Sequence, residues 1–160
     1  MKKLTLIAGP CAIEDDQTGF EIAEKIKSIC DQYNLDYIFK ASYRKANRSK
    51  NNSFTGIGDD AALNIINKIG KEFDLPTITD VHESHEPKKV ANYVSNLQIP
   101  AFLCRQTDLL IAAAKTNKII NVKKGQFLAP WDMVNVTKKI SDSGNKNILV
   151  TERGASFGYN

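Results

Sequence analysis

Apolar residues recur along the chain with two alternating periods. Short runs of β-branched and other apolar residues, typical of buried strands, alternate with longer stretches in which apolar residues recur every three or four positions, as on one face of a helix. The strand-like runs are Leu4–Ala8, Tyr37–Lys40, Thr77–Val81, Leu97–Leu103, Ile119–Val122 and Asn147–Val150. The pattern therefore predicts six strands, and a helical stretch follows each of the first five.

The helical stretches are read from their apolar stripes and from the residues that stop them. One helix is predicted from about Asp16 to Tyr33, and shorter helices over Glu86–Val94 and Asp108–Lys115. Pro76 ends another, because the residue before a proline is disfavoured in helical geometry, and Gly144 ends the last. The apolar stripes of these two helices are Ala62, Ile65, Ile66, Ile69 and Phe73 in the first and Met133, Val136 and Ile140 in the second.

The strand–helix alternation predicts an α/β fold with right-handed crossovers and a parallel sheet. An open doubly wound sheet would carry a Gly-x-Gly-x-x-Gly turn after its first strand, and the sequence has none. Instead, every strand is followed at once by a polar or reactive cluster, which is typical of a (β/α)8 TIM barrel. We therefore predict an incomplete barrel of about six strands and five helices. No linker interrupts it, so residues 1–160 are predicted to form one partial TIM-barrel domain.

Composition excludes several classes of protein. The 160 residues are 42% apolar and 25% charged, and the net charge is a modest +4. No nucleic-acid-binding motif occurs, so no nucleic-acid partner is expected. Three widely spaced cysteines favour a reducing compartment, and no stretch approaches the ~20 apolar residues of a membrane span. These features predict a cytoplasmic protein with no membrane partner.

Five cationic residues lie at or shortly after the ends of three of the predicted strands. They are Lys40, Lys45, Arg48, Lys123 and Arg153. A barrel would aim them at one cavity, where they would repel one another unless anions lay between them. Phosphate and carboxylate groups are the anions that such side chains bind. Some lysines are simply solvated, and that interpretation is adopted for Lys88, Lys89, Lys138 and Lys139.

Six motifs carry a family resemblance, in order and with matching spacing. They are Ile7–Glu14, Lys45–Ser49, Thr79–Glu83, Gln98–Asp108, Asn121–Phe127 and Glu152–Gly154. Together they resemble the 3-deoxy-D-manno-octulosonate 8-phosphate synthases over essentially the whole chain. The resemblance implies an aldol-type transferase of lipopolysaccharide precursor biosynthesis, a (β/α)8 barrel that is usually a homotetramer. It would condense the small phosphorylated substrates phosphoenolpyruvate and D-arabinose 5-phosphate with water and release phosphate.

The resemblance also implies a role for each site residue. Phosphoenolpyruvate would be bound by Lys40, Ser42, Lys123 and Arg153. The sugar phosphate would be bound by Asn47, Arg48 and Ser49, and by Arg105 from a neighbouring subunit. The reacting centre would be lined by Lys45, Asp80 and Gln98.

Cys11 has two interpretations. A lone cysteine is more often a small buried hydrophobe than a ligand. The family, however, has a metal-dependent class with a cysteine at this position, so the resemblance implies a divalent metal such as Fe²⁺, Zn²⁺ or Mn²⁺. Its other ligands would be a histidine, a glutamate and an aspartate beyond Asn160, because His82 and His85 are poor substitutes.

Two departures from the family's sequence pattern have no assigned role, and two alternative functions stay open. Arg44 and Lys50 stand where the family usually has aspartate and serine, and they either tighten anion binding or are solvated. One alternative is the related 3-deoxy-heptulosonate 7-phosphate synthase, which uses erythrose 4-phosphate but typically carries Lys-Pro-Arg after its second strand. The other is a truncated, non-catalytic phosphate-binding remnant, because a closed barrel has eight strands and about 250 residues.

Overall fold

The predicted alternation of strands and helices is present in the computed structural model, which describes residues 3–158. Within them lie six strands and five α-helices, together with two short 3₁₀ helices. This is the α/β arrangement of an incomplete (β/α)8 barrel, and the predicted fold class is confirmed. None of the described helices combines the length and the apolar character that a membrane span requires.

The chain divides into two compact units, Met1–Thr79 and Asp80–Asn160. Each is described by itself below. The single-domain organisation stays a prediction.

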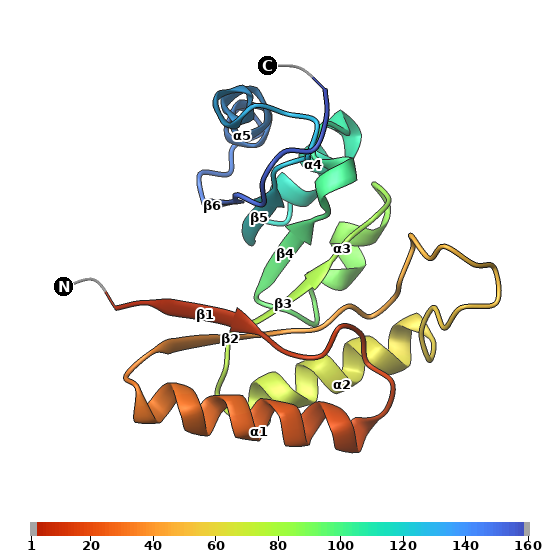
Figure 1. Cartoon of the computed structure of the whole chain (residues 1–160), viewed down its shortest axis with the longest axis vertical. Coiled ribbons are helices and arrows are strands. Elements are labelled where there is room, and N and C mark those ends of the chain that lie inside the picture. Colours follow the sequence, from red (N-terminus) through yellow and green to blue (C-terminus); the bar gives the residue numbers. More distant parts are fainter. Residues whose placement is uncertain (1–2, 159–160) are drawn as a thin grey trace. The chain divides into compact units, whose positions relative to one another are not determined.

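The first unit contains strands β1 (Thr5–Ala8), β2 (Asp36–Lys40) and most of β3 (Thr77–Asp80). β2 pairs in parallel with β1 on one side and with β3 on the other. Figure 1 shows helices α1 (Asp16–Gln32) and α2 (Asp59–Glu72) together on one side of β1 and β2. The unit is thus two successive strand–helix–strand crossovers, as the sequence predicts.

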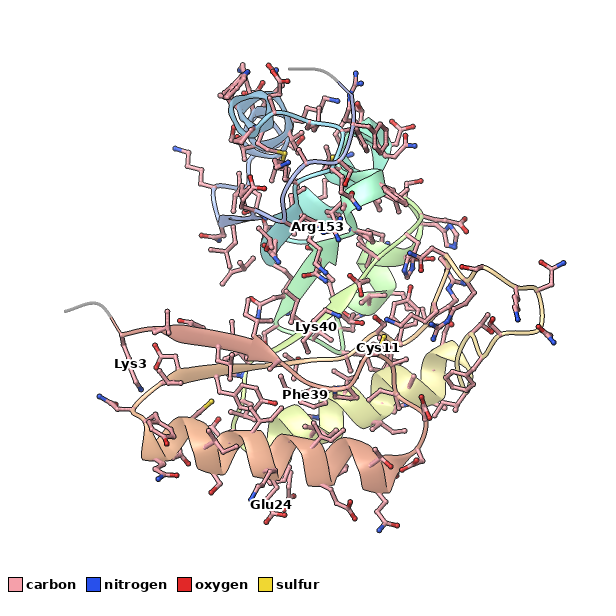
Figure 2. All side chains as sticks on the ribbon, in the orientation of Figure 1. Lys3, Cys11, Glu24, Phe39, Lys40 and Arg153 are labelled. Atoms are coloured by element: carbon pink, nitrogen blue, oxygen red, sulfur yellow. The ribbon has the colours of Figure 1, made fainter. Side chains whose placement is uncertain are left out.

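Alternation along β2 explains how these helices are held. Tyr37, Phe39 and Ala41 are buried, and Figure 2 shows Phe39 pointing from β2 towards the helices, while Glu24 points away from the sheet. The α2 stripe, including Ile66 and Ile69, is also buried. Successive side chains of a strand point to opposite faces, so the residue after Phe39, Lys40, is directed to the face that the helices do not cover.

The second unit contains β4 (Asn96–Ile99), β5 (Ile119–Lys123) and β6 (Ile148–Thr151), paired in parallel in that order. Its helices are α3 (Glu86–Val90), α4 (Thr107–Ala114) and α5 (Met133–Asp142). The strands have two chemically distinct faces. One carries the buried apolar residues Leu97, Ile99, Ile120 and Val122, and the other carries the buried amides Asn96, Gln98 and Asn121.

Two predicted boundaries are wrong, and both errors have local causes. β4 ends at Ile99, and the predicted strand residues Ala101–Leu103 form a 3₁₀ helix after Pro100. Proline lacks an N–H for the ladder, and the Pro100 carbonyl instead accepts a hydrogen bond from Leu103 N at 3.0 Å. The helix predicted over Glu86–Val94 ends at Val90 and continues only as turns.

Gly9 follows β1 directly and lies against the backbone of Lys40, the last residue of β2. Its φ is +155°, and a Cβ placed there would lie 2.2 Å from the Lys40 carbonyl oxygen. Gly9→Ala should therefore lower the free energy of unfolding by about 2–4 kcal/mol, from backbone overlap and strain together. The matched control is Gly144→Ala, because Gly144 also has a positive φ of +94° but open space around the added Cβ.

Urea denaturation of the two variants separates these effects. The control should lose only about 1–2 kcal/mol, the cost of the left-handed conformation alone. Equal losses in both variants would show that the contact between Gly9 and Lys40 imposes no constraint.

Candidate functional site

In the first unit, a cationic cluster lies at and just beyond the ends of β1 and β2. Its cations are Lys40, Lys45 and Arg48, whose charges all act on Cys11. An isolated parallel bridge joins Ala12 to Ser42, and Ile13 N donates to the Ser42 carbonyl at 3.1 Å, so pairing continues past both strand ends. Lys45 Nζ donates to the buried Ser42 hydroxyl at 2.9 Å. The structure thus brings the predicted residues Cys11, Ser42 and Lys45 together.

Cys11 is exposed within this cluster, and Figure 2 labels it with Lys40. A hydrogen bond with Lys45 lowers the pKa of the Cys11 thiol. Burial, the second-largest cause, opposes this shift, and the positive charges of Lys45, Arg48 and Lys40 each lower the pKa by a smaller amount. Nearby cations favour the anionic form of an acid, so the cluster favours a thiolate and, by the same field, other anions.

The loop after β2 carries the predicted sugar-phosphate ligands. Asn47, Arg48 and Ser49 are all exposed. The loop is closed at its base by a 2.8 Å hydrogen bond from Lys45 N to the Thr55 carbonyl. Arg48 Nε donates to the Phe54 carbonyl at 2.9 Å, which holds one edge of the guanidinium against the loop backbone.

The two departures from the family pattern behave differently. Arg44 lies 3.5 Å from the Asp59 carboxylate and 5.8 Å from the centroid of the Tyr43 ring. Its charge is therefore balanced locally. Lys50 is exposed on the loop, and the structure assigns it no particular role.

In the second unit, a chain of side-chain hydrogen bonds runs from the last residue of β3 across β4, β5 and β6. Thr151 Oγ1 donates to Asn121 Oδ1 at 2.9 Å, and Asn121 Nδ2 donates to Gln98 Oε1 at 2.9 Å. Gln98 Nε2 then donates to Asp80 Oδ1 at 2.6 Å. We call Asp80, Gln98, Asn121 and Thr151 the polar ladder. The structure thus joins two predicted residues of the reacting centre, Asp80 and Gln98.

Beside the polar ladder, Lys124 is buried although it carries a charge. Its side chain is 1% exposed, and Nζ lies 3.5 Å from the Glu152 carboxylate. Nζ donates to the carbonyls of Gly125, Leu128 and Gly154 at 3.2, 2.9 and 2.8 Å. Lys124 thereby connects the end of β5 to the loop after β6.

Arg153 lies in the loop after β6, whose backbone is held by hydrogen bonds to Glu152. The Glu152 carboxylate accepts hydrogen bonds from the backbone N–H groups of Gly154 and Arg153 at 2.6 and 2.8 Å. The Gly154 N–H is the main cause of the lowered Glu152 pKa; Arg153 N–H and Lys124 add to it. Arg153 is exposed, and Lys123 is half-buried at the end of β5.

Arg105 lies apart from these contacts. It is exposed after the 3₁₀ helix that follows β4, and its carbonyl accepts a hydrogen bond from Lys139 Nζ at 3.3 Å. No contact of the guanidinium argues for or against its predicted role in a neighbouring subunit.

The described residues do not form a metal site on their own. Across residues 3–158, no group of three or more His, Cys, Asp and Glu side chains is arranged to hold an ion. Cys11 supplies a single thiolate, and one thiolate leaves most coordination positions without a protein ligand. The role of Cys11 as a metal ligand therefore stays a prediction.

Sequence reasoning missed three residues of these clusters. Asn121 interrupts the apolar run Ile119–Val122, and a lone amide within a buried strand is a signal that it has a hydrogen-bond partner. Thr151 gave no signal, because a threonine is ordinary in a strand. The burial of Lys124 could not be predicted, because two lysines stand side by side at Lys123-Lys124 and the sequence does not indicate which of the two is buried.

The fold and the clusters define a chain of the (β/α)8-barrel class whose polar and cationic side chains gather at strand ends. The DAHP synthetase I family matches residues 1–160, and the chain belongs to this family.

Several curated relatives are similar to nearly the whole chain. One from Fusobacterium nucleatum subsp. nucleatum is 55% identical over 159 residues, which cover 99% of this chain and 57% of the relative. Relatives from Mesorhizobium japonicum and Bartonella henselae are 56% and 54% identical over 98% of this chain, and 57% and 56% of their own lengths. All three are named 2-dehydro-3-deoxyphosphooctonate aldolase. The resemblance seen in the motifs is confirmed, and the chain spans about 57% of the length of the Fusobacterium relative.

Proposed function

We propose that this chain is part of an enzyme that condenses phosphoenolpyruvate with D-arabinose 5-phosphate and water to give 3-deoxy-D-manno-octulosonate 8-phosphate and phosphate. The observation that carries the proposal is the cationic cluster at the strand ends of the first unit. Lys45 contacts Ser42 and Cys11 there, and the charges of Lys40 and Arg48 act on the same thiol. The name shared by the relatives, 2-dehydro-3-deoxyphosphooctonate aldolase, supports this choice of reaction.

We propose the following roles within the first unit. Lys40 and Ser42 bind phosphoenolpyruvate, and Asn47, Arg48 and Ser49 bind the phosphate of the sugar. Lysine provides a point charge and arginine a planar fork that matches phosphate. Lys45 lies at the reacting centre, where its ammonium stabilises the negative charge of the intermediate without reorganisation.

Within the second unit, Lys123 and Arg153 bind phosphoenolpyruvate, and Asp80 and Gln98 line the reacting centre. In the proposed reaction, carbon 3 of the enol attacks the sugar aldehyde and water adds at carbon 2. The phosphate then leaves with its C–O bond broken. Fixed donors and cations are the expected source of rate, because both substrates are anions that must be held together.

The location, the oligomeric state and the metal of the whole protein are also proposals. We propose a cytoplasmic homotetramer in which Arg105 acts on the sugar phosphate of a neighbouring subunit. Cys11 is proposed as one ligand of a divalent metal, which when bound would act as a Lewis acid. The residues described here do not complete that site, and no step above depends on it.

The experiment that tests this function uses a chimera, in which residues 1–160 are followed by the C-terminal part of the Fusobacterium nucleatum relative beyond the matched region. Phosphate release is measured with phosphoenolpyruvate and either arabinose 5-phosphate or erythrose 4-phosphate, in the chimera and in the 160-residue chain. Release that requires arabinose 5-phosphate supports the proposal. Preference for erythrose 4-phosphate favours the heptulosonate alternative, and binding without release by the chimera favours the non-catalytic one.

Arg48 should govern recognition of the sugar phosphate. In the chimera, Arg48→Ala should lower kcat/KM for arabinose 5-phosphate by about 10- to 150-fold, the scale of a charge-assisted hydrogen bond. Arg48→Lys should not restore it, because lysine lacks the planar fork. The comparison substrate is unphosphorylated arabinose. A loss that is equal for both sugars would contradict the assigned role.

A further inference from the structure

The polar ladder of the second unit has a defined direction. An ionised carboxylate only accepts hydrogen bonds, so Asp80 requires the nitrogen of the Gln98 amide on its side. The Gln98 oxygen then faces Asn121 and requires a nitrogen from it, which in turn places the Asn121 oxygen towards Thr151. The Thr151 hydroxyl completes the series as a donor. With Asp80 ionised, this orientation of the two amides gives each of the three hydrogen bonds a donor and an acceptor.

The ladder is built into the regular part of the sheet. Gln98 and Asn121 are register partners on β4 and β5, and Thr151 is the register partner of Lys123 on β5 and β6. Gln98 and Asn121 are 2% and 3% exposed. A buried amide that lost a partner would leave polar atoms unpaired, which is costly. The Gln98 amide is therefore held in one orientation by Asn121 on the adjacent strand and, through it, by Thr151 on the strand after that.

This orientation has a chemical consequence at Gln98. Its Nε2 carries two N–H groups, of which one is given to Asp80 at 2.6 Å. The second remains on the Asp80 side of the amide, where it can donate to an oxygen of a bound substrate. If the amide were turned over, its oxygen would face the Asp80 carboxylate, and the group presented to the substrate would be an acceptor.

We propose that Asn121 and Thr151 are positioning residues, which act through Gln98 to present an N–H donor beside Asp80 to an oxygen of the reacting substrate. The inference rests on the proposed function for the identity of the reaction. The ladder itself stands on the hydrogen bonds within the second unit. Neither Asn121 nor Thr151 is expected to touch substrate.

The test compares isosteric and conservative variants of Thr151. Thr151→Val removes the hydroxyl and keeps the shape, whereas Thr151→Ser keeps the hydroxyl. In the chimera, Thr151→Val should lower kcat about tenfold with less than about twofold change in the KM for phosphoenolpyruvate, because orientation rather than binding is lost. Thr151→Ser should retain kcat within about twofold. Thr137→Val is the matched control, since its hydroxyl bonds only to carbonyls within α5, and it should leave both constants unchanged.

A second readout does not depend on activity. The side-chain amide protons of Gln98, observed by NMR in the 160-residue chain, should exchange slowly with solvent in the wild type and in Thr151→Ser. They should exchange about tenfold faster in Thr151→Val. Asn121→Asp should have at least as large an effect, because it sets an acceptor against the Gln98 oxygen.

The outcomes separate the two proposals. Unchanged exchange and kcat in Thr151→Val, or a kcat in Thr151→Ser as low as in Thr151→Val, would overturn the positioning role even if the wild-type chimera made the expected product. A wild-type chimera without the proposed reaction would instead contradict the proposed function, and amide exchange would still decide whether Thr151 orients Gln98.

Discussion

Replacing Lys124 with methionine should lower the free energy of unfolding by about 2–4 kcal/mol. The lysine is buried, and its ammonium donates to three carbonyl oxygens, of Gly125, Leu128 and Gly154. Methionine fills a similar volume but leaves these acceptors without their donor. Because unpaired polar groups in the interior cost more than an average hydrogen bond contributes, the loss should exceed that of an ordinary substitution.

Lys138→Met is the matched control for this experiment. Lys138 also pairs with a carboxylate, Asp142 at 2.8 Å, but its side chain is 68% exposed. Exposed pairs contribute little, so the control should change the stability by less than about 0.5–1 kcal/mol. The check is urea denaturation of the 160-residue chain followed by circular dichroism. A Lys124→Met variant as stable as the control would show that the loop after β6 does not depend on this ammonium.

Lys123→Ala and Arg153→Ala should each weaken the use of phosphoenolpyruvate by about 10- to 150-fold in kcat/KM, which corresponds to about 1.5–3 kcal/mol for a charge-assisted hydrogen bond. Lys123 ends β5, and Arg153 lies in the loop that Glu152 and Lys124 hold. Both are proposed to bind the anionic groups of this substrate. Kinetics of the chimera with varied phosphoenolpyruvate and saturating arabinose 5-phosphate measure the effect.

Lys115→Ala supplies the control for charge alone. Lys115 is exposed at the end of α4 and follows a helix rather than a strand. Its loss changes the net charge as much as the loss of Lys123 does, but it should leave kcat/KM within about twofold. If Lys123→Ala and Arg153→Ala changed kcat/KM for phosphoenolpyruvate no more than Lys115→Ala does, the proposed binding of phosphoenolpyruvate by Lys123 and Arg153 would be wrong.

Much of the fold could be predicted because each strand and helix has a strong local pattern. The stripe of α2, which includes Ile66 and Ile69, and the β-branched run of β5 each satisfy one period and not the other. The main error lies where the apolar pattern of a strand continues in the sequence but the backbone leaves the strand conformation. Ala101–Leu103 is apolar like a strand, yet Pro100 directs it into a 3₁₀ helix.

From the sequence, only those candidate site residues could be chosen whose side-chain type itself indicates a chemical role, such as a positive charge. Lys45 and Arg48 stand out as cations after a strand, and in the structure they donate to the Ser42 hydroxyl and the Phe54 carbonyl. Their binding of anions stays a prediction. Thr151 could not be identified, because its importance comes from facing Asn121 on the next strand. Such a partner depends on register, which no single stretch of sequence contains.

Analysis of the reaction product tests the central claim most directly. The chimera is incubated with phosphoenolpyruvate and an equimolar mixture of arabinose 5-phosphate and erythrose 4-phosphate, and the sugar acids are identified by mass spectrometry. The account predicts the eight-carbon acid phosphate, 3-deoxy-D-manno-octulosonate 8-phosphate, as the dominant product, and its loss in Lys123→Ala. A seven-carbon product, or an eight-carbon product formed equally well by Lys123→Ala and Arg48→Ala chimeras, would contradict it.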